Sequence, residues 1–418
     1  MCEILVDKGF KFNVGIINIF LLIASTGGVW VFDYSKPLNL SCIYVVFMSL
    51  AILQKRDISV KSFYAIISLS LVSAVLIAHY LVLSASSSIE PSNYVNLCIR
   101  LMYVVLLYIY LDTAQIDLIK CFKWVLTAIF VHSIINFVFL QFVIPHELLR
   151  PYGKADTPTQ TFLYVFYFWQ TIRVMNFPFI RSQGIFWEPG VLQVFLNLLL
   201  YIELNMFTNN RLKIVLIVIA ILLTFSTAGY SIAAYLLIVY GLKHGHIKLK
   251  LKSLVVTVPA VATGVFFLYT NLIDKLSFDN SISLAYRLFD LEKSLDIIKN
   301  HTFIGLGFST EVFPAYQFDS KLLSLSGQYI QSTFTSDAGN TNSILMLYVS
   351  FGCVMATIYL ITLYNQSIFN KMPVVFFISL IIICFSEPLV TNNMFLFLFI
   401  SGCVRFLGST NRRIYNLR

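Results

Sequence analysis

The chain has 418 residues, of which 58% are hydrophobic and only 12% are charged, and its mean hydropathy is +0.81. A soluble domain carries about twice that share of charged residues, so the composition excludes a soluble globular protein and indicates an integral membrane protein. The formal net charge of +9 does not indicate a nucleic-acid partner. Most basic residues lie in short loops, where membrane insertion and anionic lipids account for them.

Twelve apolar segments are predicted to cross the membrane, because a span needs roughly 20 apolar residues to cross a core of ~30 Å. The stretch from Arg211 to Lys243 is predicted to hold two short crossings with a break at Ser226-Thr227-Ala228-Gly229, since one crossing would leave a basic flank outside. We therefore expect an all-α polytopic membrane protein with a single domain over 1–418. The predicted spans are 14–32, 38–53, 63–83, 95–111, 122–144, 189–207, 212–225, 229–241, 253–271, 342–364, 373–388 and 391–407.

Basic residues divide by the side of the membrane. The short loops on one side hold most of the Lys and Arg residues, whereas the short loops on the other side hold only Lys36. Lys and Arg accumulate on the cytoplasmic side, so both termini are predicted to be cytoplasmic. Two long segments, 145–184 and 272–340, then fall on the outer side, and these loops are where we expect function to lie.

The first outer loop is predicted to contain a helix. Thr157-Pro158-Thr159-Gln160 has the pattern of a capping box with proline at the first helical position, which predicts a helix from about 158 to Met175. The segment is dense in aromatic residues, which are typical of the interfacial belt of a membrane protein. We therefore expect this helix to lie on the outer membrane–water boundary.

The second outer loop is predicted to contain a helix over about 282–299. Apolar residues recur there at helical spacing, and a polar face lies beside them with Arg287, Asp290 and Ser294. Arg287 is either an anion ligand or a solvated charge that Asp290 balances at i+3. The apolar stripe consists of Leu284, Leu288, Leu291, Leu295 and Ile298.

The string from Arg181 to Gly190, Arg-Ser-Gln-Gly-Ile-Phe-Trp-Glu-Pro-Gly, is the strongest candidate site. Pro189 suits the first turn of a span, whose N-terminus would present N–H groups and a positive dipole end to an anion. Arg181 matches a phosphate bidentately, and Gly184 and Gly190 would let the backbone approach a ligand. The alternative is structural: Arg181 pairs with Glu188, and Trp187 anchors the helix at the interface.

Other candidates are more isolated. Arg100 lies within the fourth predicted span, about a turn from its outer end, where it either binds a ligand or extends outward to water. His301, Asp337 and Asn342 precede the tenth span and could orient or deprotonate a hydroxyl. His79 and His132 are expected to be hydrogen-bonded packing residues. The seven cysteines avoid the outer loops, and no HExxH, DxD or CxxC pattern occurs, so no metal is expected.

At these residues the chain resembles the Wzy-type O-antigen polymerases of bacteria, which are related to the O-antigen ligases. The resemblance rests on the Arg181–Gly190 string and on two further stretches. One runs from Arg287 through Ser294-Leu-Asp-Ile-Ile to Gly305-Leu-Gly307, and the other is Asn340-Thr-Asn342 followed by Gly352. The resemblance implies an inner-membrane polymerase that transfers a growing glycan from undecaprenyl pyrophosphate to a lipid-linked repeat unit at the periplasmic face.

The resemblance also implies roles for residues and partners. Arg181 and Arg287 would bind the pyrophosphate with support from Arg100, and Glu188 and Asp337 would act on the acceptor hydroxyl. The expected partners are undecaprenyl-pyrophosphate-linked oligosaccharide, membrane lipids, a chain-length regulator and a flippase, with no nucleic acid, cofactor or metal. Gly184, Trp187, Gly190, His301 and Asn342 would line the substrate site.

Two departures from the family pattern bear on this interpretation. Relatives often carry an arginine in the break between spans seven and eight, where this chain has Ser226-Thr227-Ala228-Gly229-Tyr230. Ligases usually have a histidine near the start of span ten, where this chain has Asn342, which favours a polymerase over the ligase alternative. A lipid-linked oligosaccharide flippase is the alternative outside enzymes, but the spans carry few charges beyond Arg100 and Glu203.

Overall fold

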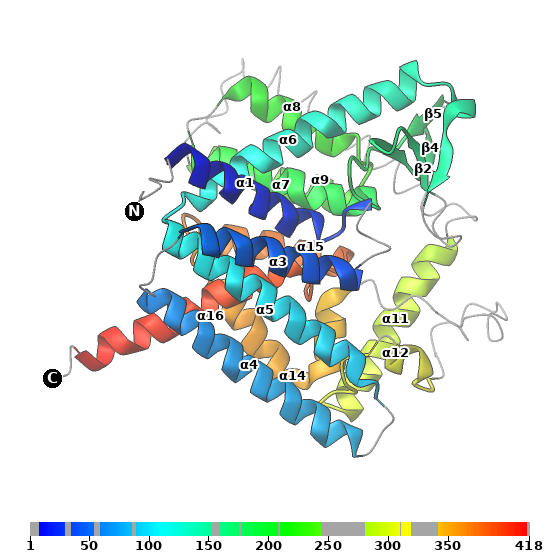
Figure 1. Cartoon of the computed structure of the whole chain (residues 1–418). Helices are drawn as coiled ribbons and strands as arrows, with labels where there is room; N and C mark the ends of the chain where they lie inside the picture. Colours follow the sequence, from blue (N-terminus) through cyan, green and yellow to red (C-terminus); the bar gives the residue numbers. More distant parts are fainter. Residues whose placement is uncertain are drawn as a thin grey trace. The chain divides into compact units, whose positions relative to one another are not determined.

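The computed structural model describes residues 8–29, 35–53, 59–85, 89–152, 159–174, 177–207, 210–243, 281–309, 311–318 and 342–415. Contacts divide the chain into two compact units. Unit 1 comprises Met1–Thr26, Lys36–Leu118 and Ile282–Arg418, and unit 2 comprises Gly27–Ser35 and Ile119–Ser281. Both units are built mainly from apolar helices (Figure 1).

In unit 1, long apolar helices pack side by side. Helix α4 packs against α5 and α16, and α14 packs against α15 and α16 (Figure 1). Pro91 and Pro373 stand in the first turns of α5 and α15, where the missing N–H has no helical partner to lose. The helices are α1 (Lys8–Ala24), α3 (Ser35–Leu53), α4 (Val60–Ser84), α5 (Pro91–Ala114), α11 (Ser281–Asn300), α12 (Val312–Ala315), α14 (Ser343–Tyr364), α15 (Pro373–Ser386) and α16 (Asn393–Tyr415).

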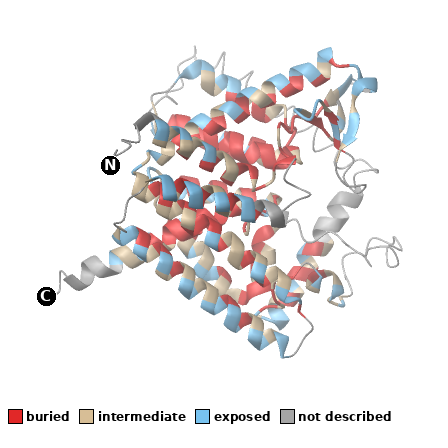
Figure 2. Cartoon of the chain, viewed as in Figure 1, coloured by how far each residue is buried: buried red, intermediate tan, exposed pale blue. Residues whose placement is uncertain are grey.

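Unit 2 is organised around a buried helix. Helix α7 is buried along nearly its whole length, and α8 and α9 pack against it (Figure 2). A helix that is apolar on all sides is typical of a core position. The elements are α6 (Leu118–Val138) with its π-helical extension η1 (Phe139–Val143), the 3-10 turn η2 (His146–Leu148), five short strands, α7 (Pro189–Asn205), α8 (Arg211–Leu222) and α9 (Thr227–Lys243).

A buried carboxylate ties three helix ends of unit 2 together. Glu203 on α7 accepts from Lys213 Nζ at 2.6 Å and lies 3.4 Å from Lys123 Nζ. Lys123 also stands over the ring of Phe207, 3.8 Å from its centroid. A buried charge is tolerated when it is paired in this way, so helix packing accounts for this charge within a span.

The hydropathy prediction is confirmed at the level of helices. Every predicted span overlaps a helix except 253–271, which lies outside the described residues. In the part of the chain that the structure describes, four helices are long and apolar enough to cross a membrane, namely Val60–Ser84, Pro91–Ala114, Leu118–Val143 and Ser343–Tyr364, and several others are shorter and apolar. The chain is therefore a multi-pass helical membrane protein, but a total of twelve crossings is not established. A break is present as predicted, but it lies about one turn earlier. Helix α8 ends at Leu222 and α9 begins at Thr227, so of the four predicted residues only Ser226 lies in the break.

The predicted helix from 158 to Met175 is wrong. This segment instead forms antiparallel strands: β1 (Arg150–Tyr152), β2 (Thr159–Phe162) and β3 (Phe166–Phe168) make one sheet, and β4 (Thr171–Val174) and β5 (Phe177–Ile180) make another. Its β-branched and aromatic residues suit a pleated surface, and burial alternates along β2. Thr157 and Pro158, which gave the helix signal, lie outside the described residues.

Candidate functional site

The Arg181–Gly190 string forms an irregular segment of unit 2 that leads into α7. Backbone hydrogen bonds of 2.8 and 3.1 Å pair residues 27–29 with residues 185–187, as a short antiparallel bridge. The first span was predicted to extend to residue 32, but α1 ends at Ala24, before the Gly27-Gly28 pair. A side chain on Gly27 would stand 3.1 Å from α7, so this glycine allows the two segments to approach closely.

The guanidinium of Arg181 lies at the break between α8 and α9. Its Nε donates to Thr224 O at 3.2 Å, and its Nη2 donates to Phe225 O at 3.4 Å. Its Nη1 donates to Gln170 Oε1 at 2.5 Å. Thr224 and Phe225 belong to the turn after α8, so Arg181 holds together a strand end, a turn and the entry to α7.

Arg211 and Lys213 lie in the first turn of α8 and indicate that this helix starts near a membrane boundary, so we expect the break to lie within the membrane. Helix α8 has 12 residues, which rise only about 18 Å, whereas the hydrocarbon core is ~30 Å thick. Irregular backbone at that depth is tolerated only where protein or a water-filled cavity satisfies it, and Arg181 donates to two of its carbonyl groups. A guanidinium carries five N–H donors, so holding the turn and binding an anion are compatible roles. Relatives often carry an arginine within this break. This chain does not, but the guanidinium of Arg181 reaches the break from another segment.

Gln183, two residues further on, was not identified from the sequence. Its side chain is fully buried, and neither its amide nitrogen nor its amide oxygen has a hydrogen-bond partner among the described residues. The preceding Ser182 is also buried, but its N–H donates to Leu223 O at 2.9 Å. Buried polar groups are normally paired, so an unmatched amide beside Arg181 marks a place for water or ligand atoms. A glutamine in a loop has no pattern that would reveal this in a sequence.

The other residues of the string have largely structural positions. Gly184 has a φ of +59° and packs between α6 and α7, so it serves a turn. Pro189 and Gly190 are buried in the first turn of α7, so the predicted anion-binding helix end is covered within unit 2. Trp187 and Glu188 are half-buried.

In unit 1, the predicted helix over 282–299 is confirmed as α11. The polar face, and not the leucine stripe, packs inward, because Asp290 and Ser294 are buried while Leu291 and Leu295 are 40% and 53% exposed. Arg287 belongs to α11 at three and seven residues before Asp290 and Ser294, and its side chain lies outside what the structure describes.

Lys293 is a second cation on this inward face, and the sequence analysis did not single it out. Its side chain is buried, its Nζ donates to Pro314 O at 3.3 Å, and it stands 5.0 Å from the centroid of the Phe313 ring. Burial lowers the pKa of Lys293, whereas the neighbouring Asp290 carboxylate acts in the opposite direction. The contacts to Phe313 and Pro314 fix α11 against the short helix α12.

Gly305 and Gly352 allow two backbone segments of unit 1 to cross in close contact. Three backbone hydrogen bonds of 2.7, 2.8 and 3.0 Å join residues 302–307 to residues 349–353 in the middle of α14. Gly352 interrupts α14 with a φ of +71°, and Gly305 has a φ of +74°. A Cβ on Gly352 would lie 2.3 Å from Phe303 O. The chain after α11 is therefore held on α14 by a junction that only glycine permits.

Both histidines that were expected to serve packing do so. His79 on α4 shares hydrogen bonds of 2.8 Å with the Tyr94 hydroxyl and with Ile304 O. His132 on α6 shares a 3.0 Å hydrogen bond with Val165 O. Each histidine therefore holds an outer segment against a span.

Two of the acid–base candidates of the second loop, His301 and Asn342, have different contacts in the structure. His301 is exposed, and its ring lies 6.2 Å from the ring of Tyr316, whose hydroxyl donates to Asp296 at 2.8 Å. Asn342 is the N-cap of α14, and its Oδ1 accepts from two backbone N–H groups at 3.1 Å. Asp337 lies outside the described residues.

Arg100 lies within α5, nine residues after the helix begins at Pro91, which is roughly 14 Å along its axis. Its Nη1 is 3.5 Å from Asn392 Oδ1. An arginine at this depth is expensive, which supports a functional role more than a simple extension to water.

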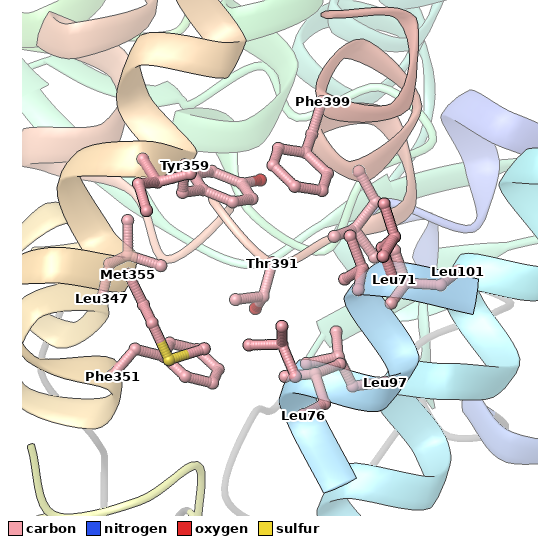
Figure 3. Close-up of a pocket in the computed structure, with 14 residues that line it drawn as sticks. Leu71, Leu76, Leu97, Leu101, Leu347, Phe351, Met355, Tyr359, Thr391 and Phe399 are labelled. Carbon is pink, nitrogen blue, oxygen red and sulfur yellow. The ribbon is translucent and has the colours of Figure 1, made fainter. Parts of the chain in front are cut away.

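Unit 1 also contains an apolar cavity of about 220 Å³, and Arg100 is not among the residues that line it. The cavity lies between α4, α5, α14 and α16, with Leu97 and Leu101 on either side of Arg100 along α5. Figure 3 shows Phe351 and Tyr359 opposite these leucines, with Thr391 between the two walls. Almost all of its lining is hydrocarbon, so the cavity suits an apolar chain and not a sugar.

Comparison with known families identifies one part of the chain. Residues 212–360, from α8 to near the end of α14, match the sequence model of the family described as O-Antigen ligase. The chain carries an O-antigen ligase family domain. Neither the comparison with curated proteins nor that with solved structures gave a match. The matched segment contains the α8–α9 break, α11 and the glycine junction.

The family domain supports a membrane enzyme of the glycosyl-transfer type. It confirms the resemblance found in the sequence, and it assigns a role in glycan processing without separating polymerase from ligase. Among the described residues, no group of three or more His, Cys, Asp and Glu residues is arranged to hold a metal ion.

Proposed function

We propose that the protein is an O-antigen polymerase of the bacterial inner membrane. It transfers a growing glycan from undecaprenyl pyrophosphate to a lipid-linked repeat unit at the periplasmic face. In this proposal both termini are cytoplasmic and the segments 145–184 and 272–340 are periplasmic, as the distribution of Lys and Arg predicts.

The position of Arg181 is the observation that carries the proposal. Its guanidinium donates to Thr224 O and Phe225 O in the irregular turn between α8 and α9, which we place within the membrane. This turn belongs to the segment that matches the family, and Arg181 precedes that segment in the chain. When the glycosyl bond breaks, negative charge accumulates on the pyrophosphate oxygens. A cation that is already fixed in a water-poor site stabilises that charge without reorganisation. Arg287, a residue of α11, is the proposed second ligand.

The reaction needs only the substrates and the protein. The acceptor hydroxyl oxygen forms a bond to the anomeric carbon of the donor, and the bond from that carbon to the pyrophosphate oxygen breaks. Glu188 and Asp337 are the proposed acceptors of the hydroxyl proton. The pyrophosphate leaves on its lipid carrier, so neither a nucleotide nor a cofactor is required. We propose that arginine takes the place that a divalent metal ion has in other pyrophosphate reactions.

The lipid character of the substrate is supported by the apolar cavity of unit 1, whose lining suits a hydrocarbon chain. The proposed partners are undecaprenyl-pyrophosphate-linked oligosaccharide and membrane lipids, together with a chain-length regulator and a flippase. His301, Gly184, Trp187, Gly190 and Asn342 remain proposed contacts of the substrate.

Polymerase is preferred to ligase because Asn342 stands where ligases usually have a histidine. Asn342 caps α14, which is a structural role that requires no proton transfer. The flippase alternative is less favoured, because the spans carry few charges. One of these few, Glu203, is paired with Lys123 and Lys213 and so serves helix packing.

A strain that lacks this chain tests the proposal. We expect its lipopolysaccharide to carry a single repeat unit, because flipping and ligation continue while polymerisation stops. The measurement is the band ladder on a gel, and the control is the same strain with the gene restored. Loss of all O-antigen, including the single-repeat band, would instead indicate a ligase or a flippase.

A further inference from the structure

The β2–β3 hairpin of unit 2 folds back along α6. Its turn is held to His132 through Val165 O, and Tyr167 exchanges two hydrogen bonds, of 2.8 and 3.1 Å, with the amide of Asn136. The other hairpin, β4–β5, is held at Gln141, close to the end of the helix. The turn of β2–β3 is therefore the part of this segment that lies furthest from the end of α6.

Counting residues along α6 places the turn in the membrane. The span Leu118–Val143 contains His132, which is about 21 Å from its first residue and about 16 Å from its last at 1.5 Å per residue. The hydrocarbon core is ~30 Å thick. Whichever end of the helix is placed at a boundary, the level of His132 lies inside the core.

The side chains of the turn suit such a position. Leu163, Tyr164 and Val165 are 71%, 61% and 47% exposed, and no charged residue occurs from 157 to 172. In water, an exposed apolar turn of this kind would be costly, whereas lipid chains would cover it.

The residue types at the turn support the same conclusion. Leu163 and Tyr164 have φ values of 54° and 55°, a left-handed conformation that Asn and Gly adopt readily and larger residues adopt at a cost. A hairpin in water usually has Asn-Gly or a similar pair at such positions. Here apolar side chains occupy them despite the strain, which indicates that their surroundings are apolar.

Three backbone groups of the turn have partners within the protein. Val165 N–H donates to Phe162 O at 3.2 Å, Val165 O is bonded to His132, and Tyr164 O accepts from the Tyr167 hydroxyl at 2.5 Å. In hydrocarbon, backbone groups must find partners inside the protein. The contacts of His132 and Asn136, two of the polar residues of the span, are explained by this requirement.

We propose that the β2–β3 hairpin is inserted in the hydrocarbon core, where Leu163, Tyr164 and Val165 contact the acyl chains of the surrounding lipids. The sequence had placed this segment on the membrane surface. The base of the hairpin leads to Gln170, which accepts from Arg181. Insertion would therefore hold one partner of Arg181 at a fixed depth, but the proposal itself does not depend on the enzymatic activity.

A fluorine probe tests the depth of the turn directly. Trifluoromethyl-phenylalanine replaces Tyr164 in the full chain in lipid nanodiscs, and 19F relaxation is measured with dissolved oxygen and with a water-soluble nickel chelate. We expect oxygen to have the larger effect at Tyr164. The matched control is the same probe at Phe177, an exposed aromatic residue of the other hairpin, where we expect the chelate to have the larger effect. A larger effect of the chelate at Tyr164 would overturn the proposal.

A second variant tests the turn without a probe. The double change Leu163→Asn and Tyr164→Gly supplies residues that favour this turn in water but removes the apolar contacts. If the turn is inserted, the melting temperature in nanodiscs falls. An unchanged or raised melting temperature would show that the turn lies in water, which contradicts the proposal.

Discussion

Replacing Arg181 with alanine is expected to abolish long O-antigen chains while the protein stays in the membrane at its normal level. The loss of one donor that stabilises the transition state typically costs ~3 kcal/mol, which is about a hundredfold in rate. Arg181→Lys is expected to be impaired as well, because a single ammonium group cannot reach Gln170, Thr224 and Phe225 in the planar arrangement of a guanidinium. The measurement is the lipopolysaccharide ladder together with the amount of protein in the membrane.

Gln170→Ala is the matched control for this prediction. It removes the 2.5 Å partner of Arg181 but leaves the guanidinium on the α8–α9 turn. We expect a smaller loss of chain length than in Arg181→Ala. A normal ladder from Arg181→Ala would leave no role for the arginine in the reaction. A ladder lost together with the protein itself would make Arg181 a residue that only stabilises the fold.

Replacing Gly352 with alanine is expected to detach residues 302–307 from α14 and to destabilise the protein strongly. A Cβ at this position would lie 2.3 Å from Phe303 O, at a φ of +71°. Overpacking costs about 1–3 kcal/mol and left-handed backbone about 1–2 kcal/mol, so we expect a loss of about 2–5 kcal/mol. The measurement is the melting temperature in detergent or nanodiscs, with protease sensitivity after α11 as a local probe.

Gly408→Ala is the control for the glycine junction. Gly408 lies in α16, and a Cβ there would be 3.7 Å from Tyr64, an ordinary contact. Alanine favours a helix more than glycine does, so this change should leave stability the same or raise it slightly. Equal effects of the two substitutions would contradict the role of the junction.

The helices could be predicted from the sequence because a bilayer leaves few alternatives. Any chain that crosses hydrocarbon must satisfy its own backbone, so a long apolar run in a chain of this composition becomes a helix. The break before Thr227 followed from the basic residues on both sides of it. The first outer loop was misjudged, since dense aromatic residues suit a strand as well as an interfacial helix. Which of the two forms depends on its partner α6, which lies elsewhere in the sequence.

For the candidate site, the sequence identified residues but not their partners from distant parts of the chain. Arg181 stood out because of its neighbours in the chain, but its partners Gln170, Thr224 and Phe225 lie 11 to 44 residues away. The two faces of α11 were visible in its residue pattern. The pattern did not show which face packs inward, because in a membrane protein an apolar face can contact lipid while the polar face packs against the protein. The buried amide of Gln183 had no sequence signal.

The central claim is that fixed arginines promote glycan transfer from a lipid pyrophosphate without a metal ion. The most direct measurement gives purified protein lipid-linked repeat units in excess EDTA and follows the length of the products. We expect chains of several repeats in EDTA, and none from the Arg181→Ala variant. If chelation stops elongation and magnesium or manganese restores it, the arginine account of leaving-group stabilisation is wrong.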